Sequence, residues 1–300
     1  MEKFIIEVEE DFKEMRLDSF LAEYFKDNSR SFFQNLILDN LVLVNEKETK
    51  SKYKVKSGDI ITVMFPELQM LKVEPENIPL DILYEDNDVI VINKPQNMVV
   101  HPAAGNYNGT LVNALLYHCK DLSGINGVIR PGIVHRIDKD TTGVLVIAKN
   151  NNAHHFLAEQ LKEHSMNRIY IALCEGIIKE DTITINKPIG RNPKDRLKMG
   201  IVPGGKEAIT HVEVIERFKD HTLVKCKLET GRTHQIRVHM ASINHPLVGD
   251  PLYGYKKQKF NLNGQVLHAK LLGFIHPSSR EYMEFTTELP EYFKELIKKL

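Results

Sequence analysis

The sequence contains no tryptophan, only three cysteines and no net charge at pH 7. Cys119, Cys174 and Cys226 lie far apart and form neither a Cys-x-x-Cys pair nor a zinc-ligand spacing, so we expect reduced, buried thiols. No apolar run approaches the ~20 residues that a membrane-spanning helix needs. Residues 1–4 lack the basic region and the apolar stretch that open a secretory signal. These absences predict a cytoplasmic protein without a membrane partner.

Signals for metals and nucleotides are missing as well. Of the 13 histidines, His154 and His155 are adjacent and cannot share one helix face, and no His-Glu-x-x-His occurs. The segment Gly204–Lys206 lacks the paired glycine spacing of a phosphate-binding loop. From these residues we expect no catalytic metal and no phosphate-binding loop.

Charged residues are plentiful but unevenly distributed. Residues 1–70 hold 10 Lys and Arg against 14 Asp and Glu, whereas Lys187–His239 holds 12 against 6. A local excess of positive charge in a neutral protein is compatible with contacts to nucleic-acid phosphates. A chain of 300 residues also suggests about two domains, at roughly 150 residues each.

Residues 13–65 predict a small α+β module. Apolar residues recur at helical spacing over Arg16–Phe25 and again over Arg30–Asp39, where Ser29 can cap the second helix. Strands are expected at Leu41–Val44 and Ile60–Phe65. Residues 66–79 then hold three prolines and no sustained period, which predicts an extended linker.

Residues 80–300 predict a second, larger domain. It opens with a hairpin whose two apolar runs flank the turn Asp86–Asp88. Strands outnumber helices and follow one another in hairpin order, which favours a mixed, mainly antiparallel α+β fold over a doubly wound sheet. The expected helices are Thr110–Cys119, Asn152–Glu163 and Thr233–Ser242, the last capped by Thr233. The expected strands are Arg168–Glu175, Ala208–Arg217 and Thr222–Glu229.

The most informative stretch reads His-Arg-Ile-Asp-Lys-Asp-Thr-Thr-Gly over residues 135–143. It places Asp138 in a loop between the apolar runs Gly132–Val134 and Gly143–Ala148. A carboxylate that a rigid scaffold holds ionised and dry can attack carbon. Taken alone, the stretch is better explained by a turn. A kinase catalytic loop does not fit, because Ile137 breaks its spacing and no Asp-Phe-Gly follows.

This stretch resembles the RluA/RluD-type family of RNA pseudouridine synthases, in which it reads His-Arg-Leu-Asp-x-x-Thr-Ser-Gly. Ile137 and Thr142 are conservative departures from that pattern. Further matches to the family follow in the same order along the chain. They are Asn93–Pro95, His101–Pro102, Asn167–Leu173, Thr230–His239, His245–Gly254 and Leu267–Ala269.

The resemblance implies roles for individual residues. Asp138 would be the catalytic nucleophile, Tyr170 would stack on the uracil, and Arg237 would pair with Asp138 and keep it charged. Ile236 or Val238 would pack on the other face of the ring. The family chemistry moves uracil from a nitrogen to a carbon bond on the same ribose, which needs no metal and no cofactor. The attacked atom, ribose carbon 1 or uracil carbon 6, stays open.

Further residues are implied in binding RNA. The target uridine has to leave its stack, and Arg136 would fill the vacated space or bind a phosphate. Residues 13–65 resemble an S4-type RNA-binding domain, with Asn40 where a glycine is usual. Arg16, Ser29 and Arg30 are the residues there that would contact RNA.

We therefore expect a monomeric, cytoplasmic RNA pseudouridine synthase that modifies large-subunit ribosomal RNA. Three alternatives remain: a transfer-RNA pseudouridine synthase, an RNA-binding ribosome-assembly factor without turnover, and a carboxylate-dependent glycosidase. The last needs two cooperating carboxylates, and only Asp140 lies near Asp138 in the sequence.

Overall fold

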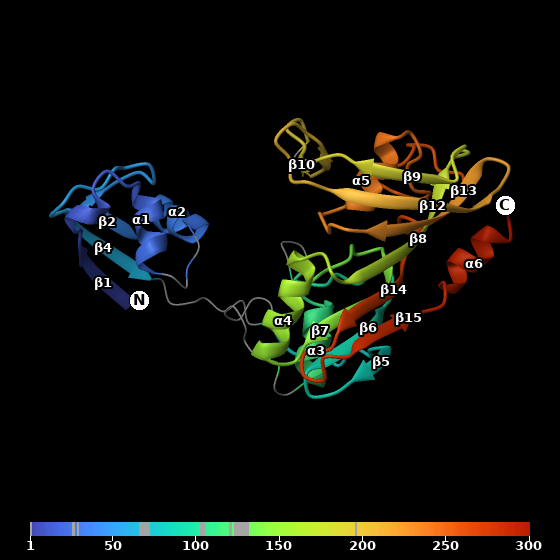
Figure 1. Cartoon of the computed structure of the whole chain (residues 1–300), viewed down its shortest axis with the longest axis horizontal. Coiled ribbons are helices and arrows are strands. Elements are labelled where there is room, and N and C mark those ends of the chain that lie inside the picture. The colour runs from blue at the N-terminus through green and yellow to red at the C-terminus, as the bar shows by residue number, and fades with distance from the viewer. Residues whose placement is uncertain are drawn as a thin grey trace. The chain divides into compact units, whose positions relative to one another are not determined.

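The computed structural model describes residues 2–25, 28, 30–65, 73–102, 106–119, 122, 132–195 and 197–300. The chain forms two compact units, Met1–Met70 and Leu71–Leu300 (Figure 1). The predicted cap Ser29 and the first part of the predicted linker lie outside the described residues. None of the helices in the described segments is both long and apolar enough to cross a bilayer.

The first unit is an antiparallel four-stranded sheet in the order β1-β4-β2-β3, accompanied by two helices. The apolar stripes of the helices, including Phe20 and Phe33, are buried together with Val42 and Val63 of the sheet. Strand β1, which precedes the region of helical periodicity, pairs along its whole length with β4. The elements are β1 Glu2–Glu7, η1 Glu10–Phe12, α1 Leu17–Tyr24, α2 Arg30–Leu38, β2 Val42–Val44, β3 Lys47–Glu48 and β4 Ile60–Phe65.

The second unit is built on a nine-stranded sheet in the order β5-β6-β7-β14-β8-β13-β12-β9, with β15 paired to β14. All of its ladders are antiparallel except the one between β7 and β14. The predicted mixed, mainly antiparallel α+β class is therefore confirmed. The strands are β5 Ile82–Glu85, β6 Val89–Lys94, β7 Thr142–Ala148, β8 Asn167–Glu175, β9 Thr182–Asn186, β12 Ile209–Arg217, β13 His221–Leu228, β14 Leu267–Ile275 and β15 Tyr282–Thr286.

The remaining elements of this unit are four helices and a separate two-stranded ribbon. They are α3 Leu111–His118, α4 Asn151–Lys162, α5 Gln235–Ser242, α6 Glu291–Ile297, β10 Ile189–Arg191 and β11 Met199–Ile201. Each predicted helix of the unit is present, within two residues of its expected ends. The predicted cap Thr233 is wrong, because α5 begins after His234, whose left-handed backbone (φ 57°) turns the chain into the helix.

The parallel contact between β7 and β14 positions the loop that carries Asp138. It joins Thr142 to His268 and Gly143 to Ala269. Gly143 has a φ of 113°, and a Cβ there would overlap the backbone oxygen of Ala269, so only glycine fits. The loop therefore enters β7 directly beside β14, in the middle of the sheet.

Candidate active site

A pocket of about 540 Å³ opens beside the Asp138 loop. Asp138, Tyr170, Arg237, Arg136 and Ile236, which the sequence separates by as many as 101 positions, all line it. Val238 does not; it lies in a small apolar cluster with β10. The other lining residues are Val134, His135, Ile137, Thr141, Leu161, Lys162, His164, Arg168, Leu228, Gly231, Arg232, His234, Gln235 and Leu267.

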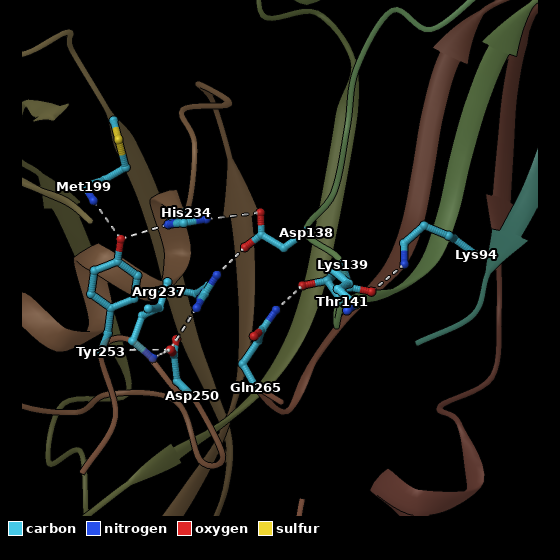
Figure 2. Close-up of polar contacts among 11 residues, drawn as sticks. Lys94, Asp138, Lys139, Thr141, Met199, His234, Arg237, Asp250, Tyr253 and Gln265 are labelled. Carbon is cyan, nitrogen blue, oxygen red and sulfur yellow. Dashed lines mark hydrogen bonds and ion pairs between the residues drawn. The ribbon is translucent and has the colours of Figure 1, made fainter. Parts of the chain in front are cut away.

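Side chains from outside the loop bind its backbone and one of its side chains (Figure 2). The Nζ of Lys94, at the end of β6, donates to the backbone oxygen of Lys139 at 2.9 Å. The amide of Gln265 donates to the hydroxyl of Thr141 at 3.0 Å. Lys94 is fully buried and burial lowers its pKa to about 7. Its role was not predicted, although the sequence match included Asn93–Pro95.

Arg237 on α5 joins two carboxylates. Its Nη1 donates to Oδ2 of Asp138 at 2.8 Å, while Nε and Nη2 donate to the two oxygens of Asp250 at 2.7 and 2.8 Å. The predicted contact between Arg237 and Asp138 is present. Arg237 makes only this one bond to Asp138, because its planar guanidinium matches the two oxygens of Asp250.

The pair of Arg237 and Asp250 is almost completely buried. Asp250 is 0% and Arg237 4% exposed, while Asp138 is 19% exposed to the pocket. Burial alone would lower the pKa of Arg237, but hydrogen bonds and charge from Asp250, together with Asp138, raise it above its usual value. Arg237 therefore presents a permanent positive charge to Asp138.

Asp250 also orders the turn that follows it. Its Oδ1 accepts the backbone N–H groups of Leu252 and Tyr253 at 2.9 and 3.0 Å. The residue lay inside a matched motif, but no role was predicted for it. An acid directly before a proline was the only signal in the sequence, and a turn explains that signal equally well.

His234 approaches the second oxygen of Asp138. Its Nε2 lies 3.8 Å from Oδ1, and its Nδ1 lies 2.8 Å from the hydroxyl of Tyr253. That hydroxyl accepts the backbone N–H of Met199 at 2.9 Å (Figure 2). Burial lowers the pKa of His234, so the ring is neutral at pH 7. No role was predicted for His234, although it lies inside the matched segment Thr230–His239.

Tyr170 projects into the pocket from β8 and is 8% exposed. Burial raises the pKa of its phenol, and the negative charge of Asp138 adds to this effect. The phenol is therefore protonated at neutral pH and offers an uncharged ring surface next to the carboxylate. Such a surface suits stacking on a planar base.

In the first unit, Arg16 and Arg30 are both engaged with Asp18. Each donates to the buried Asp18 carboxylate at 3.0 Å, and Gln34 adds a bond at 2.6 Å. Burial alone would raise the pKa of Asp18, but these bonds hold it well below its usual range. The arginine side chains remain 44% and 49% exposed. Their contact with RNA stays a prediction.

Away from the pocket, Glu85, His118 and Cys119 place potential metal-ligand atoms within 4.8 Å of one another. The carboxylate of Glu85 already binds Lys149 at 2.7 Å and His118 at 2.8 Å. The expected absence of a metal therefore stays a prediction.

Comparisons with known proteins identify the chain. The family model described as RNA pseudouridylate synthase matches residues 88–242, which include the Asp138 loop, β8 and α5. The chain belongs to the RNA pseudouridine synthase family. The S4 domain model matches residues 15–61 of the first unit.

Full-length relatives agree with this assignment. The synthase is 53% identical over 100% of its length to a Bacillus subtilis protein named uncharacterized RNA pseudouridine synthase YlyB, of which 99% is covered. It is 48% identical to ribosomal large subunit pseudouridine synthase D of Zymomonas mobilis, over 95% of this chain and 93% of the relative. The structure of human RNA pseudouridylate synthase domain containing 1 matches with a TM-score of 0.58 at 27% identity, over 79% of this chain and 97% of the human chain.

Proposed function

We propose that this synthase converts uridines of large-subunit ribosomal RNA to pseudouridine, with Asp138 as the nucleophile. The observation that carries the proposal is the position of Asp138. It is held at a pocket by Arg237, and Arg237 is itself fixed by the buried Asp250. A carboxylate kept ionised in a partly dry site can form a covalent bond to carbon.

The other pocket residues fit the steps of an isomerisation. Uracil has to be detached from ribose, turned and rejoined, so the site has to hold a free base. Tyr170 offers a neutral ring and Ile236 an apolar surface for that base. Arg136 is exposed at the pocket, where it can occupy the space that a flipped uridine leaves in the RNA.

The charge of the pocket supports an RNA substrate. Among its described lining residues, Asp138 is the only carboxylate, against the cations Arg136, Lys162, Arg168, Arg232 and Arg237. A glycosidase mechanism with two carboxylates has no second acid there. The relatives named for the large ribosomal subunit and the S4 match favour ribosomal over transfer RNA. We expect the protein to act in the cytoplasm as a monomer.

Mapping pseudouridines in total RNA tests the proposal. Cells that lack the gene should lose one or more pseudouridines from large-subunit ribosomal RNA. Wild-type protein should restore them, and Asp138→Asn should not. Loss confined to transfer RNA would overturn the substrate assignment, and restoration by Asp138→Asn would overturn the mechanism.

A further inference from the structure

Arg168 is a buried cation that the proposed chemistry does not use. It lines the pocket, is 6% exposed, and lies two residues before Tyr170 on β8. Successive residues of a strand alternate between faces, so the two side chains project from the same face of the sheet, roughly 7 Å apart along the strand. Arg168 thus lies next to the expected position of the base.

The guanidinium of Arg168 has little to bind within the protein. Nη2 donates to the backbone oxygen of Glu229 at 2.7 Å, whereas the buried Nε has no hydrogen-bond partner. No carboxylate of the described segments lies within ion-pair distance of it. A guanidinium carries five N–H donors, and a buried charge without a counterion is costly to a protein.

A neighbouring glycine leaves room for the end of the Arg168 side chain. Gly231 is exposed, and a Cβ added to it would lie only 2.6 Å from Nη1 of Arg168. Arg232 follows and also lines the pocket. Burial lowers the pKa of Arg168 and the charge of Arg232 adds to this effect. A bound anion would stabilise the charged form of Arg168 and so oppose both the burial and the repulsion from Arg232.

We propose that Arg168, with Arg232 beside it, binds a backbone phosphate that flanks the target uridine. This inference rests on the proposed function, because it assumes that RNA enters the pocket. Arginine binds phosphate through charge-assisted hydrogen bonds. One end of the pocket would hold the base against Tyr170, and the other would fix the backbone of the same nucleotide, so that ribose faces Asp138.

Neutral backbone linkages provide the test. The RNA is a synthetic fragment that spans the mapped uridine, with one methylphosphonate on its 5′ side, on its 3′ side or several nucleotides away. Affinity and single-turnover rate are measured for each RNA. We expect one flanking neutral linkage to weaken binding or turnover by wild-type protein by about tenfold to a hundredfold, and the distant linkage to have little effect.

Variants connect that loss to Arg168. Arg168→Gln should show a similar loss with the native RNA and little further loss with the neutral linkage. Gly231→Ala keeps the charge but displaces the flexible end of Arg168. Its affinity and rate should therefore also change little when the flanking phosphate is replaced by the neutral linkage. Arg280→Gln is the matched control: Arg280 is exposed and stacks on Phe156, away from the pocket. This variant should lose as much affinity or rate with the neutral linkage as wild type does.

The outcomes separate the two proposals. Equal affinity and rate of wild type for native and neutral RNAs, or undiminished sensitivity in Arg168→Gln, would overturn the phosphate subsite. Failure of wild type to modify native RNA would overturn the proposed function, while the affinity measurements would still test the subsite. Thermal unfolding checks that Arg168→Gln folds. If it does not fold, the sensitivity of Gly231→Ala to the neutral linkage decides whether the phosphate subsite exists.

Discussion

Arg237 binds Asp250 with two hydrogen bonds and Asp138 with only one. The buried pair fixes the plane of the guanidinium, and the remaining Nη1 then points toward Asp138 (Figure 2). The carboxylate that we propose as nucleophile is thus oriented by an arginine that cannot itself turn away. Asp250 acts on Asp138 through Arg237.

The first prediction concerns Arg237→Lys, which keeps the positive charge but loses the planar guanidinium with its several N–H donors. Lysine offers one point contact, so it cannot bind Asp250 through two parallel bonds and reach Asp138 as well. We expect the single-turnover rate at saturating enzyme to fall by at least tenfold, with RNA affinity changed far less. Asp250→Asn should lower the same rate with Arg237 intact. A near-normal rate with weakened RNA binding would assign Arg237 to RNA docking.

The second prediction concerns Asp138→Asn, which keeps the size of the side chain and removes its charge. Since the residue is partly exposed to the pocket, the fold should tolerate the change. We expect no pseudouridine formation in a tritium-release assay and nearly unchanged affinity for RNA. Appreciable turnover would rule out Asp138 as the nucleophile. Asp140→Asn, a neighbouring carboxylate outside the lining of the pocket, is the matched control and should retain turnover.

The third prediction concerns the first unit. Residues 1–70 form a compact unit with a separate apolar core, so the second unit should fold without it. We expect the shortened protein to bind folded ribosomal RNA more weakly, with less effect on a short unstructured RNA. Arg16→Gln with Arg30→Gln should reproduce part of the defect if these arginines contact RNA. Equal rates of the full and shortened proteins on folded RNA would contradict a docking role.

The sequence predicted most local elements and five of the residues that line the pocket, but not the contacts that orient them. Helices α1 and α4 and strand β4 follow from apolar periods within each segment. By contrast, Lys94 acts on a loop 45 positions away, and the bond of Arg237 to Asp250 depends on how α5 meets the following turn. Periodicity within a segment contains no information on such pairings.

The sequence did not predict the order of the strands in the sheet either. β14 lies between β7 and β8, although it follows both by about a hundred residues, and its parallel contact with β7 joins only two residue pairs. The glycine of the Asp138 motif could be recognised from the sequence. The sequence did not show why a glycine is needed there, which is that the backbone oxygen of Ala269 leaves no room for a Cβ.

The last prediction concerns His268, which fixes this junction. It is 1% exposed, and its two ring nitrogens lie 2.7 Å from the hydroxyl of Thr142 and 3.0 Å from that of Thr287. Burial lowers its pKa to about 4, compared with about 6.5 in an unfolded chain. Between these values the unfolded state binds a proton that the folded state does not, so acidification should destabilise the fold.

We expect this histidine to cost about 2 kcal/mol of unfolding free energy at pH 5 relative to neutral pH. The loss should begin below about pH 6.5 and level off near pH 4, and His135, whose pKa burial lowers to about 3, should add to it. Urea unfolding at several pH values measures the effect. His268→Gln should be less stable at neutral pH, because it cannot span both hydroxyls, but should lose less stability on acidification. An identical pH dependence in variant and wild type would show that His268 takes up its proton equally in the folded state, and that the junction of β7 and β14 tolerates the charge.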